Sequence, residues 1–492
     1  MTESFQHIRK GPMVAVMLMG AFFALLNETL LATALPEIMV HFDIGAHQVQ
    51  WLTTAFLLTN GIMIPISAFF IGKFTTRQIF ITAITVFAFG TGVAAFSDSF
   101  ELLLVARIVQ AMGSGVMMPL MMTVLLNIFP VEKRGTALGL MGLVISFAPA
   151  IGPTLSGFLV EYYNWRMLFY AVLPIAILTW IMAFIFIKNV TEQTNPSVDV
   201  ISIVMSSLGF GGLLYGFSAG SERGWDDGLV IACVAGGFVI VGLFILRQLR
   251  LKTPLLEFRV FKNRDFSLGL TVSVFVIIAM ISAETILPMY MQTARGMTAL
   301  DSGLMLLPGA IVIGIMSPIT GILFDKFGVK KLAIPGMLIV VVTTFFFTTL
   351  DATTSITTIT VVYAIRMFGL SFGMMPVMTH ALNQIPAKLN AHGSAMANTM
   401  QQVGAAIGTA ILITIMTQAS LNFEPDMSNY AGLGAEQLEA AVSADALYSG
   451  YGLTFTVATG MALVGWLLVL FLKERRKDAV EAESVEEKRM TS

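Results

Sequence analysis

Gly61-Ile62-Met63-Ile64-Pro65-Ile66 reappears 253 residues later as Gly314-Ile315-Met316-Ser317-Pro318-Ile319, and this repeat decides the fold. Three further pairs recur at offsets of 253, 256 and 257: Lys73-Phe74 with Lys326-Phe327, Glu28-Thr29 with Glu284-Thr285, and Met117-Met118-Pro119 with Met374-Met375-Pro376. All of these pairs lie in or beside long apolar segments. Two related membrane-embedded halves are typical of secondary transporters, whose substrate site lies between the halves. The repeat therefore predicts both an architecture and a class of function.

The composition agrees with a membrane protein. Of the 492 residues, 56% are hydrophobic and 12% are charged, with a mean hydropathy of +0.82, whereas soluble domains carry about 25% charged residues. Cys233 is the only cysteine, which excludes an intramolecular disulfide.

Fourteen segments reach the roughly 20 apolar residues that a membrane-spanning helix needs. They are residues 12–35, 49–71, 79–96, 102–128, 137–160, 167–187, 200–219, 229–249, 266–291, 302–324, 332–350, 356–382, 394–420 and 451–472. We therefore expect an all-α, multi-pass membrane protein.

The basic residues predict how these spans are oriented. Of the 28 Lys and Arg residues, 23 fall in the termini or in one alternate set of connections, and only Arg166, Arg223 and Arg295 fall in the other. Because basic residues concentrate on the cytoplasmic side, both termini are expected in the cytoplasm.

The repeat and the spans together predict five regions. These are a six-helix bundle at 12–187, an inserted helix pair at 200–249, a basic cytoplasmic linker at 250–265, a second six-helix bundle at 266–472 and a charged cytoplasmic tail at 473–492. We expect the linker to be an amphipathic stretch on the inner leaflet.

Four ionisable residues lie well inside predicted spans, namely Glu28, Arg107, Glu284 and Arg366. Charges inside a membrane are costly and usually functional. Glu28 and Arg107 are predicted in the outer third of the membrane, so the two side chains can pair. Desolvation favours a neutral Glu and a nearby Arg favours a charged one. Such a carboxyl can exchange a proton as its exposure changes, although a static ion pair that fixes helix packing is the alternative.

Glu284 occupies the position in the second half that Glu28 occupies in the first. It is a candidate second proton site or a cation-attracting acid in the substrate path, and the alternative is an interfacial Glu that reaches headgroup water. Arg366 is equally compatible with a structural role. Polar side chains within the spans are the candidates for a substrate cavity: Asn27, Gln110, Glu284, Arg366, Asn398 and Gln402.

The fifth span carries two prolines and several small residues, with Pro149, Gly152, Pro153 and Gly157 the most prominent. Two prolines four residues apart remove backbone donors and predict a bend. The small residues predict close approach of another helix, and ordinary close packing is the alternative to a functional role.

Two related loops follow the second and tenth spans. Lys73 and Arg77 belong to the first loop, and Asp325, Lys326 and Gly328 belong to the second. Such loops can tie helix ends by charge and hold one conformation. Alternatively, they reflect only the positive-inside pattern.

These segments together resemble the major facilitator superfamily. The fourteen spans and the inserted pair are similar to its drug:proton antiporter-2 branch, the group of the EmrB, QacA and LmrB pumps, and most similar to the LmrB-like members. Two segments carry most of the resemblance. Gly152-Pro153-Thr154-Leu155-Ser156-Gly157 resembles the antiporter motif, and Arg107-Ile108-Val109-Gln110-Ala111-Met112-Gly113 resembles a fourth-span motif whose Arg takes part in proton transfer. The family pattern is also matched by Trp51-Leu52-Thr53-Thr54-Ala55-Phe56 and by Trp165-Arg166.

The chain also departs from the family pattern. Asn27 stands where the first-span pattern has an Asp, and the neighbouring Glu28 is rotated by about 100° around the helix. In the first loop, Gly72 replaces the expected Asp and Thr75 replaces the expected Gly. Only the second loop, with Asp325 and Gly328, keeps the pattern.

The resemblance implies proton-coupled export of amphipathic drugs or toxic compounds by alternating access, with antibiotic resistance as the outcome. It implies a monomer in the plasma (inner) membrane of a bacterium. Transport would be driven by the proton gradient, without a cofactor or metal and without nucleic acid as a partner. Whether an accessory protein takes part is left open. The 32 methionines and 37 phenylalanines can supply adaptable cavity walls, or they can simply face lipid. The alternative function is export of one endogenous metabolite, lipid or nucleotide. An enzyme is not expected, because the sequence has neither a phosphate-binding Gly-rich loop nor a metal-ligand motif.

Overall fold

The computed structural model of this chain describes residues 10–31, 34–191, 193–194, 199–425, 430 and 434–473. Fourteen helices of this part are long and apolar enough to cross a membrane, which confirms the predicted number of spans. They are α1 (Lys10–Leu30), α3 (Ala46–Lys73), α4 (Thr76–Ala95), α5 (Phe100–Ile128), α6 (Arg134–Tyr162), α7 (Met167–Phe186), α8 (Val200–Arg223), α9 (Gly228–Arg250), α10 (Arg264–Met289), α11 (Ala299–Phe327), α12 (Val329–Phe346), α13 (Ile356–Leu382), α14 (Asn390–Leu421) and α15 (Ala435–Leu470).

Several helices differ from the predicted spans at their ends. A short helix α2 (Leu35–Phe42) follows α1 and was not predicted, because eight residues are too few for a span. Helix α15 begins well before the predicted start at residue 451, since its first turns are polar and carry no hydropathy signal. Of the predicted tail, 473–492, only Lys473 lies within the described residues.

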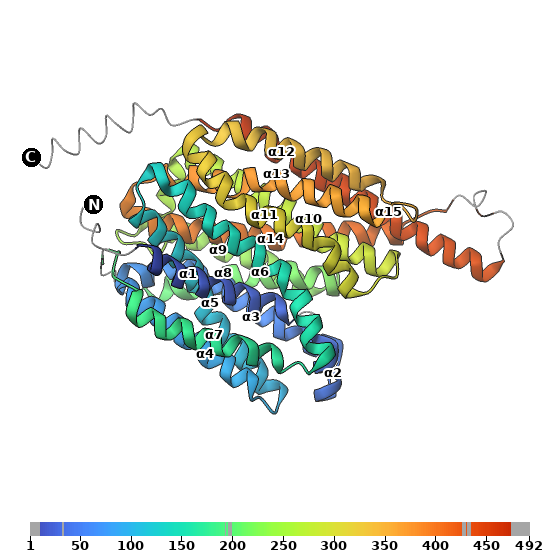
Figure 1. Ribbon diagram of the computed structural model, residues 1–492, viewed down its shortest axis with the longest axis horizontal. Helices are drawn as coiled ribbons and strands as arrows, with labels where there is room; N and C mark the ends of the chain where they lie inside the picture. Colours follow the sequence, from blue (N-terminus) through green and yellow to red (C-terminus); the bar gives the residue numbers. More distant parts are fainter. Residues whose placement is uncertain are drawn as a thin grey trace, which may run out of the picture.

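The helices form two bundles that reflect the sequence repeat. In Figure 1 the blue-to-teal helices of the first half lie below the yellow-to-red helices of the second half, and all run roughly along the same axis. Within the first half α5 packs on α3 and α4, and within the second half α13 packs on α11 and α12 in the same way. The predicted first bundle contains nearly all of α1 to α7, and the predicted second bundle contains nearly all of α10 to α15.

The two halves meet most extensively along α6 and α11. Glycines make this close approach possible. A Cβ on Gly139 of α6 would lie 2.7 Å from the carbonyl oxygen of Ser317 on α11, and one on Gly314 would lie 2.8 Å from Cδ2 of Phe147. Towards the other end, a Cβ on Gly303 would lie 3.3 Å from Oγ1 of Thr154. The small residues therefore let two helix backbones touch, as is typical of membrane helix pairs.

The inserted pair α8 and α9 lies against both halves, because α8 packs beside α3 and α14. The rings of Trp51 on α3 and Tyr215 on α8 are stacked with their centroids 5.8 Å apart. On the other side, Nε1 of Trp225, between α8 and α9, donates to Oγ1 of Thr414 on α14 at 2.7 Å. The insert therefore bridges the halves at the side where α3 and α14 face each other.

The linker after α9 packs on protein more than the predicted surface stretch implies. Leu255, Leu256 and Val260 are buried. The Leu255 backbone N–H donates to Oε1 of Gln248 on α9 at 2.7 Å, and Asn263 donates to the carbonyl of Gln384 beyond α13 at 2.9 Å. The linker thus ties the insert to the second half.

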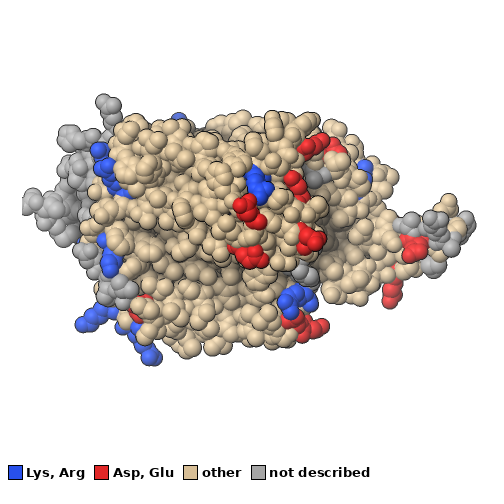
Figure 2. Space-filling view, turned by 90° about the horizontal axis from the view of Figure 1, so that it is seen from below, with Lys and Arg blue, Asp and Glu red and all other residues tan. Residues whose placement is uncertain are grey.

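Charge is distributed unevenly along the helix axis. In Figure 2 most of the blue side chains gather at one end of the visible face and the red ones toward the other, with an apolar band between them. An even number of spans returns the chain to its starting side, and Figure 1 shows the first turn of α1 and the last turn of α15 at the same end. This charge pattern is the one that a multi-pass membrane protein produces.

Candidate functional site

Arg107 is the centre of a buried polar network in the first half. It lies on α5 and is fully buried. Its Nη1 donates to Oδ1 of Asn27 on α1 at 2.7 Å and to Oε1 of Gln110 at 3.0 Å. Gln110 in turn donates to Oγ1 of Thr91 on α4 at 2.9 Å. The guanidinium also stacks on Phe56 of α3, 4.1 Å from the ring centroid. One arginine therefore connects α1, α3, α4 and α5.

The expected direct pair between Glu28 and Arg107 is not formed, which corrects that part of the prediction. Asn27 takes the position beside the guanidinium, because adjacent residues point about 100° apart on a helix. Glu28 is partly exposed, and its carboxylate has neither a hydrogen bond nor an ion pair within 4 Å among the described side chains. The carboxylate is therefore close to the arginine network without being held by it.

The second half contains a related network around Arg366. This residue is fully buried on α13. It donates through Nη2 to Oγ of Ser282 on α10 at 3.1 Å and to the carbonyl oxygen of Ala279, and through Nε to Oγ1 of Thr344 on α12 at 3.1 Å. Each arginine thus binds the first helix of its own half.

Each network includes a threonine, and the two threonines occupy repeat-related positions. Thr91 and Thr344 are 253 residues apart, which is the offset of the opening repeat. Thr91 reaches Arg107 through Gln110, whereas Thr344 contacts Arg366 directly. Sequence reasoning missed both threonines, although the shared offset was a signal that could have found them.

Glu284 on α10 repeats the situation of Glu28 on α1. It is partly exposed, and within the described part of the chain it makes no hydrogen bond and no ion pair. The buried Tyr363, one helical turn from Arg366 on α13, interacts electrostatically with Glu284. Each half therefore holds a carboxylate that lies close to a buried arginine and is unpaired among the described residues.

The proline and glycine segment lies on α6 against α1. Helix α6 continues through Pro149 and Pro153 as one helix; the side chain of Pro153 lies outside the described ones. Gly152 contacts Thr29, and a Cβ there would lie 2.9 Å from the Cβ of Thr29. The expected close approach is therefore made at Gly152, against the neighbour of Glu28. At Gly157 it is not made, because a Cβ at that position would have no described atom within 4 Å.

Asp325 makes the main polar contact between the two halves at the basic end. It lies in the last turn of α11 and accepts hydrogen bonds from the backbone N–H groups of Gly135 and Thr136, both at 2.8 Å, and from Oγ1 of Thr136 at 2.6 Å. Gly135 and Thr136 form the first turn of α6. The first N–H groups of a helix have no partner within the helix and carry a partial positive charge. The Asp325 carboxylate accepts their hydrogen bonds and also offsets that charge.

Two amide contacts accompany the Asp325 contact. Arg134, at the start of α6, donates to Oδ1 of Asn383 after α13 at 3.0 Å. Asn390, at the start of α14, donates to Oδ1 of Asn127 on α5 at 2.8 Å. These contacts were not predicted, because amide side chains near helix ends carry no distinctive sequence signal.

The other predicted gating residues have different surroundings. The Lys73 ammonium lies 5.5 Å from the ring centroid of Phe69 on its own helix. Arg77 donates to the carbonyl of Phe184 at 2.8 Å and so ties α4 to α7 within the first half. Lys326 is exposed, and Gly328 ends α11 with a φ of 79°. Gly72 occupies the position of Asp325 in the first copy, so that side of the molecule has no equivalent carboxylate.

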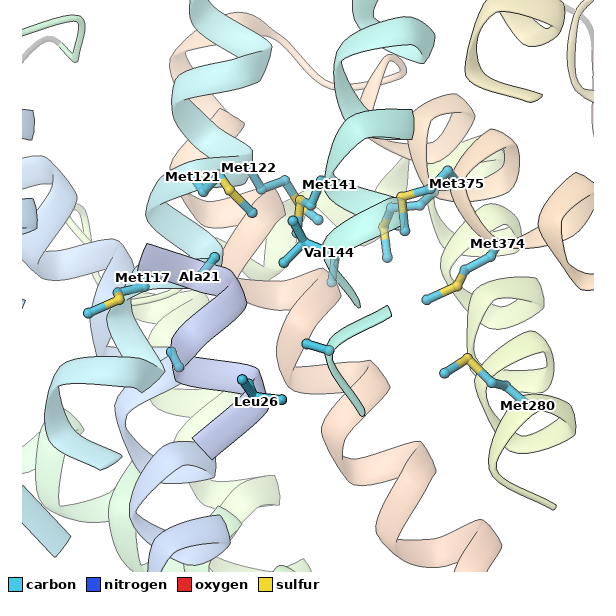
Figure 3. Packing of buried hydrophobic residues seen from close by; sticks show 14 of the residues in the cluster. Ala21, Leu26, Met117, Met121, Met122, Met141, Val144, Met280, Met374 and Met375 are labelled. Atoms are coloured by element: carbon cyan, nitrogen blue, oxygen red, sulfur yellow. The ribbon is translucent and has the colours of Figure 1, made fainter. Parts of the chain in front are cut away.

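Methionines concentrate where the halves face each other. Figure 3 shows side chains from α1, α5, α6, α10 and α13 around the central interface, including Met117, Met121, Met122, Met141, Met280, Met374 and Met375. All seven are at most 5% exposed. The candidate cavity residue Asn398 on α14 reaches this cluster, with its Nδ2 3.8 Å from Sδ of Met122, while Gln402 packs near Gly61 on α3. The thioethers supply a polarisable and adaptable surface at this interface.

Comparison with known proteins places the chain in a family. The profile of the Major Facilitator Superfamily matches residues 17–409. The MFS-type transporter YcnB of Bacillus subtilis is 49% identical over 470 residues, covering 96% of each chain. The lincomycin resistance protein LmrB of Listeria monocytogenes is 42% identical over 471 residues, covering 96% of this chain and 98% of that protein.

A solved structure agrees on the fold. The crystal structure of the human organic anion transporter MFSD10 (TETRAN) superposes with a TM-score of 0.65 over 94% of this chain and 99% of that one, at 13% sequence identity. The family and these relatives are transporters and not enzymes. With its fourteen membrane helices, its two related halves and its near full-length relatives, this chain belongs to the major facilitator superfamily.

Proposed function

We propose that this chain is a proton-coupled antiporter that exports amphipathic compounds across the cell membrane by alternating access. The observation that carries the proposal is the pair of partly exposed, unpaired carboxylates, Glu28 and Glu284, each close to a buried arginine network. A carboxylate held in a salt bridge would release its proton too readily to serve as a carrier. One that is only near an arginine can exchange its proton when the surrounding water changes.

The relatives support the nature of the cargo. Three relatives that match nearly the whole chain are named for lincomycin resistance, and a Bacillus subtilis relative named as a multidrug transporter is 29% identical over 87% of this chain. The methionine-lined interface between the halves suits apolar cargo of varied shape. Protonation of Glu28 and Glu284 would neutralise the site, and cargo would then leave as protons enter.

Alternating access requires contacts that hold one side closed. We assign this role at the basic end to Asp325 with Gly135 and Thr136, supported by the two amide contacts. Rocking of one half against the other would break these hydrogen bonds and expose the methionine cluster to the cytoplasm.

The test is proton movement in liposomes that hold the purified protein and an interior pH dye. Lincomycin or a lipophilic cation is added across an imposed pH gradient. We expect cargo-driven proton flux in the wild type, a loss of at least about tenfold in Glu28→Gln, a comparable or smaller loss in Glu284→Gln, and no flux in the double variant, since the amide cannot carry a proton. Glu101→Gln, an exposed carboxylate at the start of α5, is the matched control and should retain flux.

If both single variants keep wild-type flux, neither carboxylate carries the coupled proton and the proposal fails.

A second candidate function, export of an anionic metabolite, is favoured by one observation. Nη2 of Arg107 and Nη1 of Arg366 are buried without a hydrogen-bond partner among the described residues. Flux driven by organic anions and not by cations in the same liposomes would select this second function.

A further inference from the structure

The basic end of the molecule carries a cavity whose lining residues Gln384 and Leu389 are next to Asn383 and Asn390 in sequence. It has a volume of about 310 Å³ and lies between the linker and the connection from α13 to α14. Its wall includes Val260, Asn263, Ile385 and Leu389. Asn263 caps the start of α10, and Leu389 precedes the start of α14. The cavity therefore lies where two membrane-spanning helices begin.

Three exposed cations are sequence neighbours of residues that line this cavity. Lys262 and Arg264 flank Asn263 in sequence, and Lys388 precedes Leu389. None of the three forms an ion pair or a hydrogen bond through its side chain with another described residue. Surface cations that are free in this way remain available for an external anion.

The acids at this place do not cancel the positive charge. Glu257, which also lines the cavity, is paired with Arg259 at 3.1 Å. The Arg259 Nη2 additionally donates to the carbonyls of Leu249 and Leu251, so this guanidinium is occupied in holding the linker. Asp265, in the first turn of α10, is the only other acid of the linker region. The positive ends of the α10 and α14 dipoles add to the attraction for an anion.

The apolar part of the wall distinguishes among anions. Val260, Ile385, Pro386 and Leu389 would gain nothing from a free phosphate, whereas they can cover the glycerol and first acyl carbons of a lipid. We propose that this cavity binds the headgroup of an anionic phospholipid, with Lys262, Arg264 and Lys388 around the phosphate. Basic pockets between the ends of membrane helices are suited to such lipids. A lipid bound there would brace the linker between the insert and the second half.

The test measures lipid binding to the full-length protein in detergent by native mass spectrometry, with a short-chain phosphatidylglycerol as the probe. Phosphatidylcholine of the same chain length and inorganic phosphate are the comparison ligands. We expect phosphatidylglycerol to bind at least about tenfold more tightly than phosphatidylcholine, and the triple variant Lys262→Ala, Lys388→Ala, Arg264→Ala to lose that difference. Inorganic phosphate should not compete at equal concentration.

A matched variant separates a site from general surface charge. Lys133, Lys188 and Lys331 are also exposed at the basic end, and replacing all three with Ala removes the same charge. This control should keep the preference for phosphatidylglycerol to within about threefold of the wild type. The single exposed variant Lys388→Glu should weaken phosphatidylglycerol binding even if the triple variant does not fold. Equal losses in both triple variants, an unaffected Lys388→Glu, or full competition by phosphate would each overturn the proposal.

Discussion

At the scale of single residues, Asn27 occupies the position beside Arg107 that was predicted for its neighbour Glu28. Depth along a helix predicted that Glu28 and Arg107 lie at the same level. The structure pairs Arg107 with Asn27 instead, and leaves the carboxylate free of the guanidinium. This difference matters for function, because such a carboxylate can change its protonation state without breaking the helix contacts that Arg107 holds.

The glycines of α6 allow a prediction with an internal control. A Cβ at position 152 would overlap Thr29, whereas one at position 157 would meet open space. We expect Gly152→Ala to destabilise the protein by about 1–3 kcal/mol through overpacking, and Gly157→Ala to change stability by less than about 0.5 kcal/mol. Thermal unfolding in detergent measures both variants.

Thr29→Ala in the Gly152→Ala background should recover part of the lost stability, since it removes the oxygen that the new methyl group meets. Equal stability of the two glycine variants would show that α6 and α1 do not rely on this contact.

At the scale of elements, an ion pair holds the inserted helices together at their basic end. Asp199, which caps α8, accepts from the Arg247 guanidinium on α9 at 3.0 Å and from Oγ of Ser202 at 2.6 Å. Burial raises the pKa of Asp199, but the hydrogen bonds from Arg247 and Ser202 lower it by more, so that the net pKa lies below its ordinary value of 3.8.

The sign of the pH dependence follows from that lowered pKa. A carboxylate with a depressed pKa stabilises the folded protein above its ordinary pKa, and this contribution is lost as pH falls through the folded value. The difference in unfolding temperature between the wild type and Asp199→Asn should therefore be constant from pH 8 to about pH 5 and shrink below about pH 4. A difference that grows on acidification would contradict the assigned role of Asp199.

At the scale of the whole molecule, the contacts between the two halves at the basic end are asymmetric. Asp325 connects α11 to the start of α6, while Gly72 at the repeat-related position cannot connect α3 to α14. The insert lies beside α3 and α14, on the side that lacks the carboxylate. The two halves share a sequence repeat, but the contacts between them differ on the two sides of the molecule.

This asymmetry predicts that one substitution shifts the conformational equilibrium. Asp325→Asn removes the charge at the α6 terminus and leaves one backbone N–H without an acceptor. We expect the ratio of closed to open states to fall by about tenfold. Spin labels at positions 133 and 331, in a background with Cys233 replaced by Ser, would report a longer distance.

Asp301→Asn is the matched control, because Asp301 lies on the same helix and its side chain, within the described part of the chain, bonds to the nearby Thr298 alone. An unchanged distance distribution in Asp325→Asn, or the same shift in Asp301→Asn, would show that the Asp325 contact does not hold the closed state.

The sequence by itself determined the fourteen spans, the division into related halves and the membrane class, because burial in lipid requires long apolar helices whatever their packing. It also located Arg107, Arg366 and both carboxylates, since charges inside apolar segments are conspicuous. Only the tertiary structure decided which groups meet: Asn27 with Arg107, Asp325 with the start of α6, and the linker with α9 and Gln384. The reason is that a hydrogen bond depends on side-chain direction and on the approach of a second helix, and neither quantity is encoded in hydropathy or in residue spacing along one chain.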